Sequence, residues 1–109
     1  MRWTEVTGKQ ADNYNFEEGW TLLPDGTVLT VDIWYNGDFT LSERFNPATQ
    51  TWSSAGSTIA HLADNSGEGA TNEIGPALLR PNGTVFYFGS NHSGVAHTAI
   101  FDTSSSTVE

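Results

Sequence analysis

Short runs of apolar and β-branched residues, separated by Gly, Asn, Asp and Pro, recur along the whole chain. Most runs are roughly four to eight residues long, which is typical of strands rather than of helices. The sequence therefore predicts strands at 20–23, 27–34, 39–45, 51–53, 74–79, 84–88 and 96–101. Residues 59–63 could form one helical turn, and no longer amphipathic helix is predicted.

Turn residues indicate where these strands reverse. Residues 24–26 read Pro-Asp-Gly and residues 81–83 read Pro-Asn-Gly, and each triplet lies between two apolar runs. Glycine readily adopts the positive φ that tight hairpin turns require. We therefore expect the strands on either side of each triplet to pair in antiparallel fashion.

The chain contains two copies of one pattern. The segment 22–28, LLPDGTV, is repeated at 78–85 as LLRPNGTV, and the segment 45–52, FNPATQTW, is repeated in weaker form at 101–108 as FDTSSSTV. The copies are offset by 56 to 57 residues. A strand-rich repeat of roughly this length is typical of β-propellers and related arrays.

The repeat predicts an all-β fold of two four-stranded propeller blades within a single unit that spans 1–109. Blade one is expected at about 14–54, and blade two at about 74–109. Residues 1–6 match the start of the outer strand near 51–54, so we expect them to complete a blade, most simply one in a neighbouring chain.

Two blades cannot close a ring, because propellers have about four to eight. Each blade has apolar faces that neighbouring blades must cover. Head-to-tail association of copies removes such faces, so we expect a homo-oligomer with a six- or eight-bladed ring, in which a trimer is favoured and a tetramer is next. Trp3 and Trp52, at matched positions, are expected in the core between blades. The alternative is that the chain is an excised piece of a larger propeller.

Charge argues against two classes of partner. The chain has 13 acidic and 4 basic residues, and its net charge is −9. Nucleic acids and anionic membranes are bound through Lys and Arg, so neither is expected as a partner. No apolar run approaches the ~20 residues that span a bilayer. The N-terminus lacks the apolar core of a signal peptide, so the chain as it stands is expected in the cytoplasm, or an export signal lies outside it.

The repeat resembles the kelch and galactose-oxidase type of β-propeller, especially its bacterial members. The resemblance covers nearly the whole chain and rests on the segments 22–28, 45–52, 73–79, 78–85 and, more weakly, 101–104. It implies a propeller whose relatives include lectin-like proteins, oxidases and hydrolases.

Several residues depart from that family's pattern. Residues 31–33 and 88–90 stand where kelch blades usually carry a glycine pair, and Val108 stands where a Trp is expected. Galactose oxidases use copper with a cysteine-linked tyrosine. This chain has no cysteine, so that cofactor and the oxidase activity are not expected, and no other cofactor is predicted.

Aromatic side chains near strand ends and loops are the main candidates for ligand binding. Trp and Tyr at such places stack on sugars or anchor protein partners, although packing between blades is the alternative for each of them. In the long loop, His61 and Asp64, together with Glu68, offer nitrogen and oxygen ligands, but no metal site is predicted from their spacing. The predicted binding residues, for a glycan or a protein ligand, are Tyr14, Trp20, Trp34, Tyr35, His61 and Asp64.

No catalytic residues are predicted. His92 and His97 flank Ser93, but no acid that would orient a histidine is identifiable. Glu43 and Arg44 are expected as outward charges on a strand. The sequence therefore predicts a binding or scaffold module rather than an enzyme.

Overall fold

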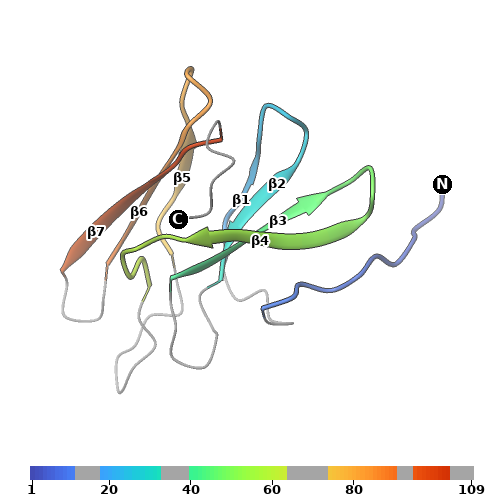
Figure 1. The fold of residues 1–109 in the computed structure, drawn as a ribbon, viewed down its shortest axis with the longest axis horizontal. Helices are drawn as coiled ribbons and strands as arrows, with labels where there is room; N and C mark the ends of the chain where they lie inside the picture. The colour runs from blue at the N-terminus through green and yellow to red at the C-terminus, as the bar shows by residue number, and fades with distance from the viewer. Residues whose placement is uncertain (12–17, 33–39, 64–73, 91–94, 104–109) are drawn as a thin grey trace.

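The computed structural model describes residues 1–11, 18–32, 40–63, 74–90 and 95–103 (Figure 1). Within these ranges the chain is all-β and contains no helix. The strands, in chain order, are β1 (Trp20–Leu22), β2 (Val28–Val31), β3 (Leu41–Asn46), β4 (Thr51–Ser57), β5 (Ala77–Leu79), β6 (Val85–Ser90) and β7 (Ala96–Phe101).

These strands form two antiparallel sheets in which sequence neighbours pair. The first sheet has the order β1-β2-β3-β4, and the second has the order β5-β6-β7. The prediction of an all-β chain is confirmed, as is the four-stranded first sheet. The second sheet has three strands among the described residues, and residues 104–109, the end of the expected second blade, lie outside the described residues.

The two predicted hairpin turns have the same geometry. Gly26 has φ 84° and its N–H donates to the Leu23 carbonyl at 2.9 Å. Gly83 has φ 86° and its N–H donates to the Arg80 carbonyl at 2.9 Å. Positive φ is strained for any residue with a Cβ, which explains why glycine occupies this position in both copies.

The strand registers are equivalent in the two sheets. Val28 is the cross-strand partner of Phe45, and Val85 is the partner of Phe101. Residues of β1 and β2 therefore have counterparts 57 positions later, and residues of β3 have counterparts 56 positions later. The sequence repeat is thus a repeat of structure.

The core lies between the two sheets. Because alternate residues of a strand point to opposite faces, each sheet has one face in this core, which we call its inner face, and one face directed away, which we call its outer face. The buried apolar residues of the core come from both sheets and from the segment after β4: Leu23, Leu29, Val31, Leu62, Val85 and Tyr87.

Some predicted bounds differ from the structure. Residues 74–76 precede β5 rather than belong to it, since Pro76 has no N–H to donate to a sheet. Residues 59–63 form no helical turn, and Ile59 has φ 57°. Residues 1–6 form no strand in the single chain.

Candidate functional site

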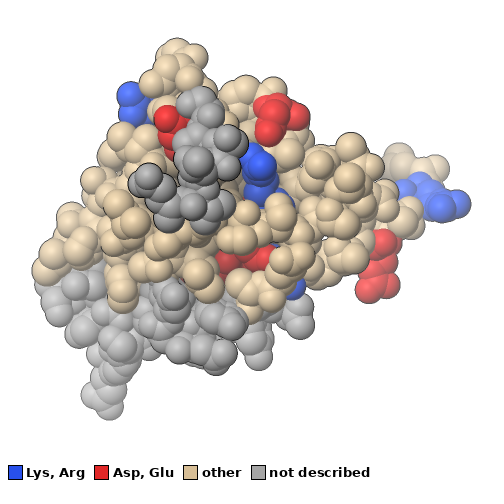
Figure 2. All heavy atoms as spheres, in the orientation of Figure 1, with Lys and Arg blue, Asp and Glu red and all other residues tan. Residues whose placement is uncertain are grey.

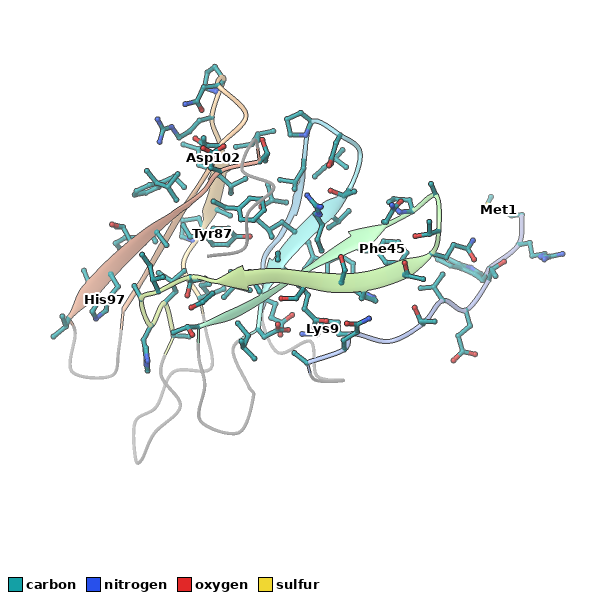
Figure 3. All side chains as sticks on the ribbon, in the orientation of Figure 1. Met1, Lys9, Phe45, Tyr87, His97 and Asp102 are labelled. Atoms are coloured by element: carbon teal, nitrogen blue, oxygen red, sulfur yellow. The ribbon has the colours of Figure 1, made fainter. Side chains whose placement is uncertain are left out.

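The only lysine of the chain is buried in a cluster of carboxylates. Lys9 lies in the N-terminal segment, Glu18 precedes β1, and Asp32 follows β2. The Lys9 Nζ lies 2.7 Å from Glu18 Oε1, 2.8 Å from Glu18 Oε2 and 2.6 Å from Asp32 Oδ1 (Figure 3). Both carboxylate side chains are fully buried. Three separate segments therefore meet at one ammonium group.

Glu43 adds a third carboxylate on the outer face of the first sheet. It was expected to point into solvent, and this prediction is wrong: its residue is 2 % exposed. The reason is that the N-terminal segment covers it. The Gln10 backbone N–H donates to Glu43 Oε1 at 2.6 Å, and the Gln10 side-chain amide donates to the Trp52 carbonyl at 2.8 Å. Thr7 adds a hydrogen bond to the Gln50 carbonyl at 3.0 Å.

Burial raises the pKa of Asp32 to about 7. The hydrogen bond and positive charge of Lys9 oppose this shift, whereas the negative charges of Glu43 and Glu18 add to it. Among the described residues, Asp32 Oδ2 also has no hydrogen-bond partner. Glu18 and Asp32 share the one ammonium, and the charge of Glu43 also acts on Asp32, so holding a proton on Asp32 reduces the repulsion among the three carboxylates.

The best explanation of this cluster is structural: it holds the N-terminal segment on the first sheet. Its ionisable side chains are buried, and their hydrogen bonds hold residues 7–10 against the outer face of the first sheet. Buried ion-pair networks shift pKa values as catalytic sites do, but a catalytic acid must also reach a substrate. The arrangement therefore positions the N-terminal segment.

The raised pKa of Asp32 predicts a pH-dependent stability. The folded chain binds a proton at Asp32 that the unfolded chain, with an ordinary pKa of 3.8, releases. Stability from this group is complete below about pH 4 and is lost as the pH rises to about 7. Urea denaturation from about pH 4 to pH 8 should therefore show a loss of a few kcal/mol, and Asp32→Asn should reduce it.

Asp25→Asn is the matched control for this experiment. Asp25 is exposed, and hydrogen bonds from Thr27 lower its pKa. Its removal should leave the fall of stability with pH intact. An unchanged pH dependence in Asp32→Asn would contradict the assignment of the proton to Asp32.

The predicted ligand-binding residues are only partly within the described structure. Tyr14, Trp34, Tyr35 and Asp64 lie outside the described residues. Trp20 lies on β1, and His61 is exposed in the segment that follows β4. The structure therefore does not test whether these six residues form one site.

Trp20 belongs to an aromatic group on the outer face of the first sheet. Its ring contacts Trp52 edge-to-face with centroids 5.6 Å apart, and Trp52 contacts Phe45 at 5.2 Å. Trp52 is 6 % exposed, whereas Trp20 is 56 % exposed. This contact lies within one sheet, so it tests neither ligand binding nor packing between blades for Trp20, and part of the Trp20 surface is uncovered.

The outer face of the second sheet is also apolar and uncovered. Leu78, Phe86 and Ile100 are cross-strand neighbours, and Phe88 lies two residues along β6 from Phe86. Leu78, Phe88 and Ile100 are all exposed. In the space-filling view the surface over β6 and β7, at the left, is mostly uncharged (Figure 2). Contiguous exposed apolar groups of this kind mark interaction surfaces.

Two pockets among the described residues are smaller than ordinary ligand sites. One, of about 110 Å³, lies between the sheets and is lined in part by Leu29, Tyr87 and Phe101. The other, of about 240 Å³, is lined in part by Gln10 and Glu43. Small-molecule pockets usually measure about 300–1,000 Å³. The uncovered faces are therefore the stronger candidates for a functional surface.

No protein-family model matches the chain, and no curated protein or solved structure was found to be significantly similar to it. In the part of the chain that the structure describes, no helix is long and apolar enough to cross a membrane. Within the same residues, no three His, Asp or Glu side chains are grouped as metal ligands would be.

Proposed function

We propose that the chain is a self-associating β-propeller module with a binding or scaffold role. In this arrangement the outer face of the second sheet of one copy packs on the outer face of the first sheet of the next copy. The observation that carries the proposal is that the chain exposes equivalents of both halves of its own internal interface.

The first half follows from the 57-residue repeat. Leu29 and Val31 are buried in the core on the inner face of the first sheet. Their counterparts are Phe86 and Phe88 of β6. Because Phe86 and Phe88 alternate with the buried Val85 and Tyr87, they lie on the outer face of the second sheet. That face is therefore equivalent to one that already binds a sheet.

The second half is on the opposite side of the molecule. Val85 and Tyr87 contribute the inner face of the second sheet. Their counterparts, Val28 and Thr30, lie on the outer face of the first sheet with Trp20 and Leu22. Trp20 and Leu22 are exposed. Contact between the two outer faces of successive copies would cover both groups of apolar residues and repeat the packing seen within one chain.

Such a contact is heterologous and closes into a ring if the rotation per copy allows it. Three copies would give six blades and four would give eight, within the about four to eight blades that propellers contain. The resemblance to kelch blades does not distinguish a ring of six blades from a ring of eight. We favour the trimer, with the tetramer next.

An alternative is that further repeats of a longer chain cover the same two faces. The same observation supports it, since equivalent faces receive equivalent sheets whichever chain supplies them. In that larger propeller, a lectin-like or enzymatic activity would depend on residues outside this chain.

Light scattering after size-exclusion chromatography tests self-association. The chain, of 11.8 kDa, should elute with the mass of three or four copies. Phe88→Glu places a charge on the outer face of the second sheet, at the counterpart of the buried Val31. It should shift the mass to that of one chain, since burying an unpaired charge is costly. Circular dichroism checks that the variant keeps its strands.

Ala48→Glu is the control variant, because it adds the same charge at the exposed turn between β3 and β4. It should assemble as the original chain does. A folded chain that remains a single copy at high concentration would overturn the proposal.

A further inference from the structure

We propose that residues 1–6 of one copy form the fourth strand of the second sheet of a neighbouring copy, along the edge of β7. This inference rests on the proposed self-association and names the contact that joins the copies. It is carried by a comparison of how two segments, 58–63 and 7–10, lie on the two sheets.

The segment 58–63 shows how a fourth strand is followed within one chain. It directly follows β4, the fourth strand of the first sheet, and then lies against the second sheet. Leu62 is fully buried in the core there, and its carbonyl lies where a Cβ on Gly89 would be. The chain therefore passes from the edge of one sheet onto the inner face of the next.

The segment 7–10 lies on the first sheet at the corresponding place. Lys9 pairs with Asp32 at 2.6 Å, and the counterpart of Asp32 in the second sheet, 57 residues later, is Gly89. Lys9 thus approaches the first sheet where Leu62 approaches the second, although Lys9 lies six residues after Trp3 and Leu62 lies ten residues after Trp52. Because 58–63 follows the fourth strand of the preceding sheet, 7–10 should also follow one, and residues 1–6 directly precede 7–10.

The preceding sheet must come from another copy. The segment 7–10 lies on the outer face of the first sheet, since it bonds to Glu43 and covers the side of the sheet away from the core. In the proposed assembly this is the face that receives the second sheet of the neighbouring copy. The docking face and the N-terminal segment therefore point to the same neighbour.

The state of residues 1–6 in the single chain agrees with this assignment. Trp52 in β4 is 6 % exposed and is the cross-strand partner of Phe45. Trp3 occupies the matched position in the sequence, yet it is 99 % exposed and belongs to no strand. The counterpart of Phe45 in the second sheet is Phe101. Trp3 should therefore pack on Phe101 of the neighbouring copy, and the added strand would pair the edge of β7 that no described strand pairs.

Disulfide trapping tests the register of this strand. The partner of Asn46 is Thr51, and the corresponding pair in the proposed contact is Asp102 and Arg2. The chain has no cysteine, so Arg2→Cys/Asp102→Cys introduces the only two thiols. Facing strand residues lie close enough for a disulfide. Mild oxidation should give covalent multimers on a non-reducing gel, and they should disappear on reduction.

Glu5→Cys/Asp102→Cys is the control, because its first thiol lies three residues out of register. It should give far fewer multimers. An Arg2→Cys/Asp102→Cys disulfide within a single chain would overturn the inference, because the segment would then pair with its own β7. Assembly of this variant without any disulfide would also overturn it and would leave self-association standing, whereas a single-chain mass would count against both.

Removal of residues 1–6 provides a second measurement. The shortened chain keeps Lys9 and its carboxylate partners, so the ion pairs between residue 9 and the first sheet are retained. The dissociation constant of the assembly should rise at least ~10-fold, since a buried Trp commonly anchors an interface. An unchanged assembly and melting temperature would show that residues 1–6, including Trp3, supply no contact, and that the edge of β7 is covered by something else, such as residues 104–109.

Discussion

Replacing Lys9 by methionine should lower the free energy of unfolding by about 3–5 kcal/mol at pH 8, the usual cost of removing one partner of a buried ion pair. Glu18 and Asp32 would both remain buried without the ammonium that lies 2.7 Å and 2.6 Å from them. Methionine fills a similar volume, so the loss of stability would result from the missing positive charge rather than from a cavity. Urea denaturation at a fixed protein concentration measures it, since association would otherwise shift the apparent stability.

The free energy of unfolding of the same variant should fall more steeply with rising pH than that of the original chain. Lys9 lowers the pKa of Asp32, so its removal raises that pKa further and extends the pH range in which ionisation destabilises the fold. Near pH 4 Asp32 is protonated and needs no ammonium partner, so the loss should be smaller than at pH 8. An equal loss at pH 4 and pH 8 would mean that Lys9 acts through packing alone.

Arg44→Met is the matched control for Lys9→Met. Arg44 also pairs with a carboxylate, that of Asp25, but at 3.7 Å and with side chains 37 % and 53 % exposed. Exposed ion pairs contribute about 0–1 kcal/mol, so this variant should lower the free energy of unfolding by no more than that. The contrast between the two variants separates the effect of burial from that of charge pairing.

Gly89→Ala should destabilise the fold by at least the ~1–3 kcal/mol that overpacking commonly costs. The added Cβ would overlap the carbonyl oxygen of Leu62. That oxygen belongs to the backbone of a fully buried residue, so it cannot rotate away as a side chain could. Either β6 or the segment 58–63 must move, and both contribute to the core. Thermal denaturation followed by circular dichroism gives the change.

Gly19→Ala is the control for this substitution. A Cβ on Gly19 would have nothing within 4 Å, and its φ lies outside the left-handed region. This variant should change stability by less than about 1 kcal/mol. If Gly89→Ala were as mild, the close packing of segment 58–63 on β6 would be contradicted, and so would the comparison with segment 7–10.

Much of the fold could be predicted from local chemistry. The Asp25-Gly26 and Asn82-Gly83 turns need positive φ, and the structure has glycine at φ 84° and 86° there. The apolar runs between turns are the strands, and β7 has the bounds expected for it. The 57-residue offset reappears in the strand register. Each of these features depends on residues that are close together in the sequence, so the sequence is enough to predict it.

The candidate surfaces could be predicted much less well. The contact of the Trp20 ring with Trp52 across the first sheet was not predicted from the sequence. Glu43 was expected in solvent, but Gln10 covers it. The role of Lys9 was missed, and its being the only lysine of an acidic chain was the one available signal. These outcomes depend on contacts between residues 23 to 42 positions apart.

The sequence by itself determined the turns, the strands and the repeat, because φ preferences and two-residue alternation act over a few neighbouring residues. Only the tertiary structure decided which face of each sheet is covered, because alternation gives every strand two faces without saying what lies against either. Two contacts settle this: the Leu62 backbone packs on Gly89 of β6, and Lys9 pairs with Asp32. It left Trp20 and Leu22 of the first sheet, the outer face of the second sheet and Trp3 exposed in the described part of the single chain.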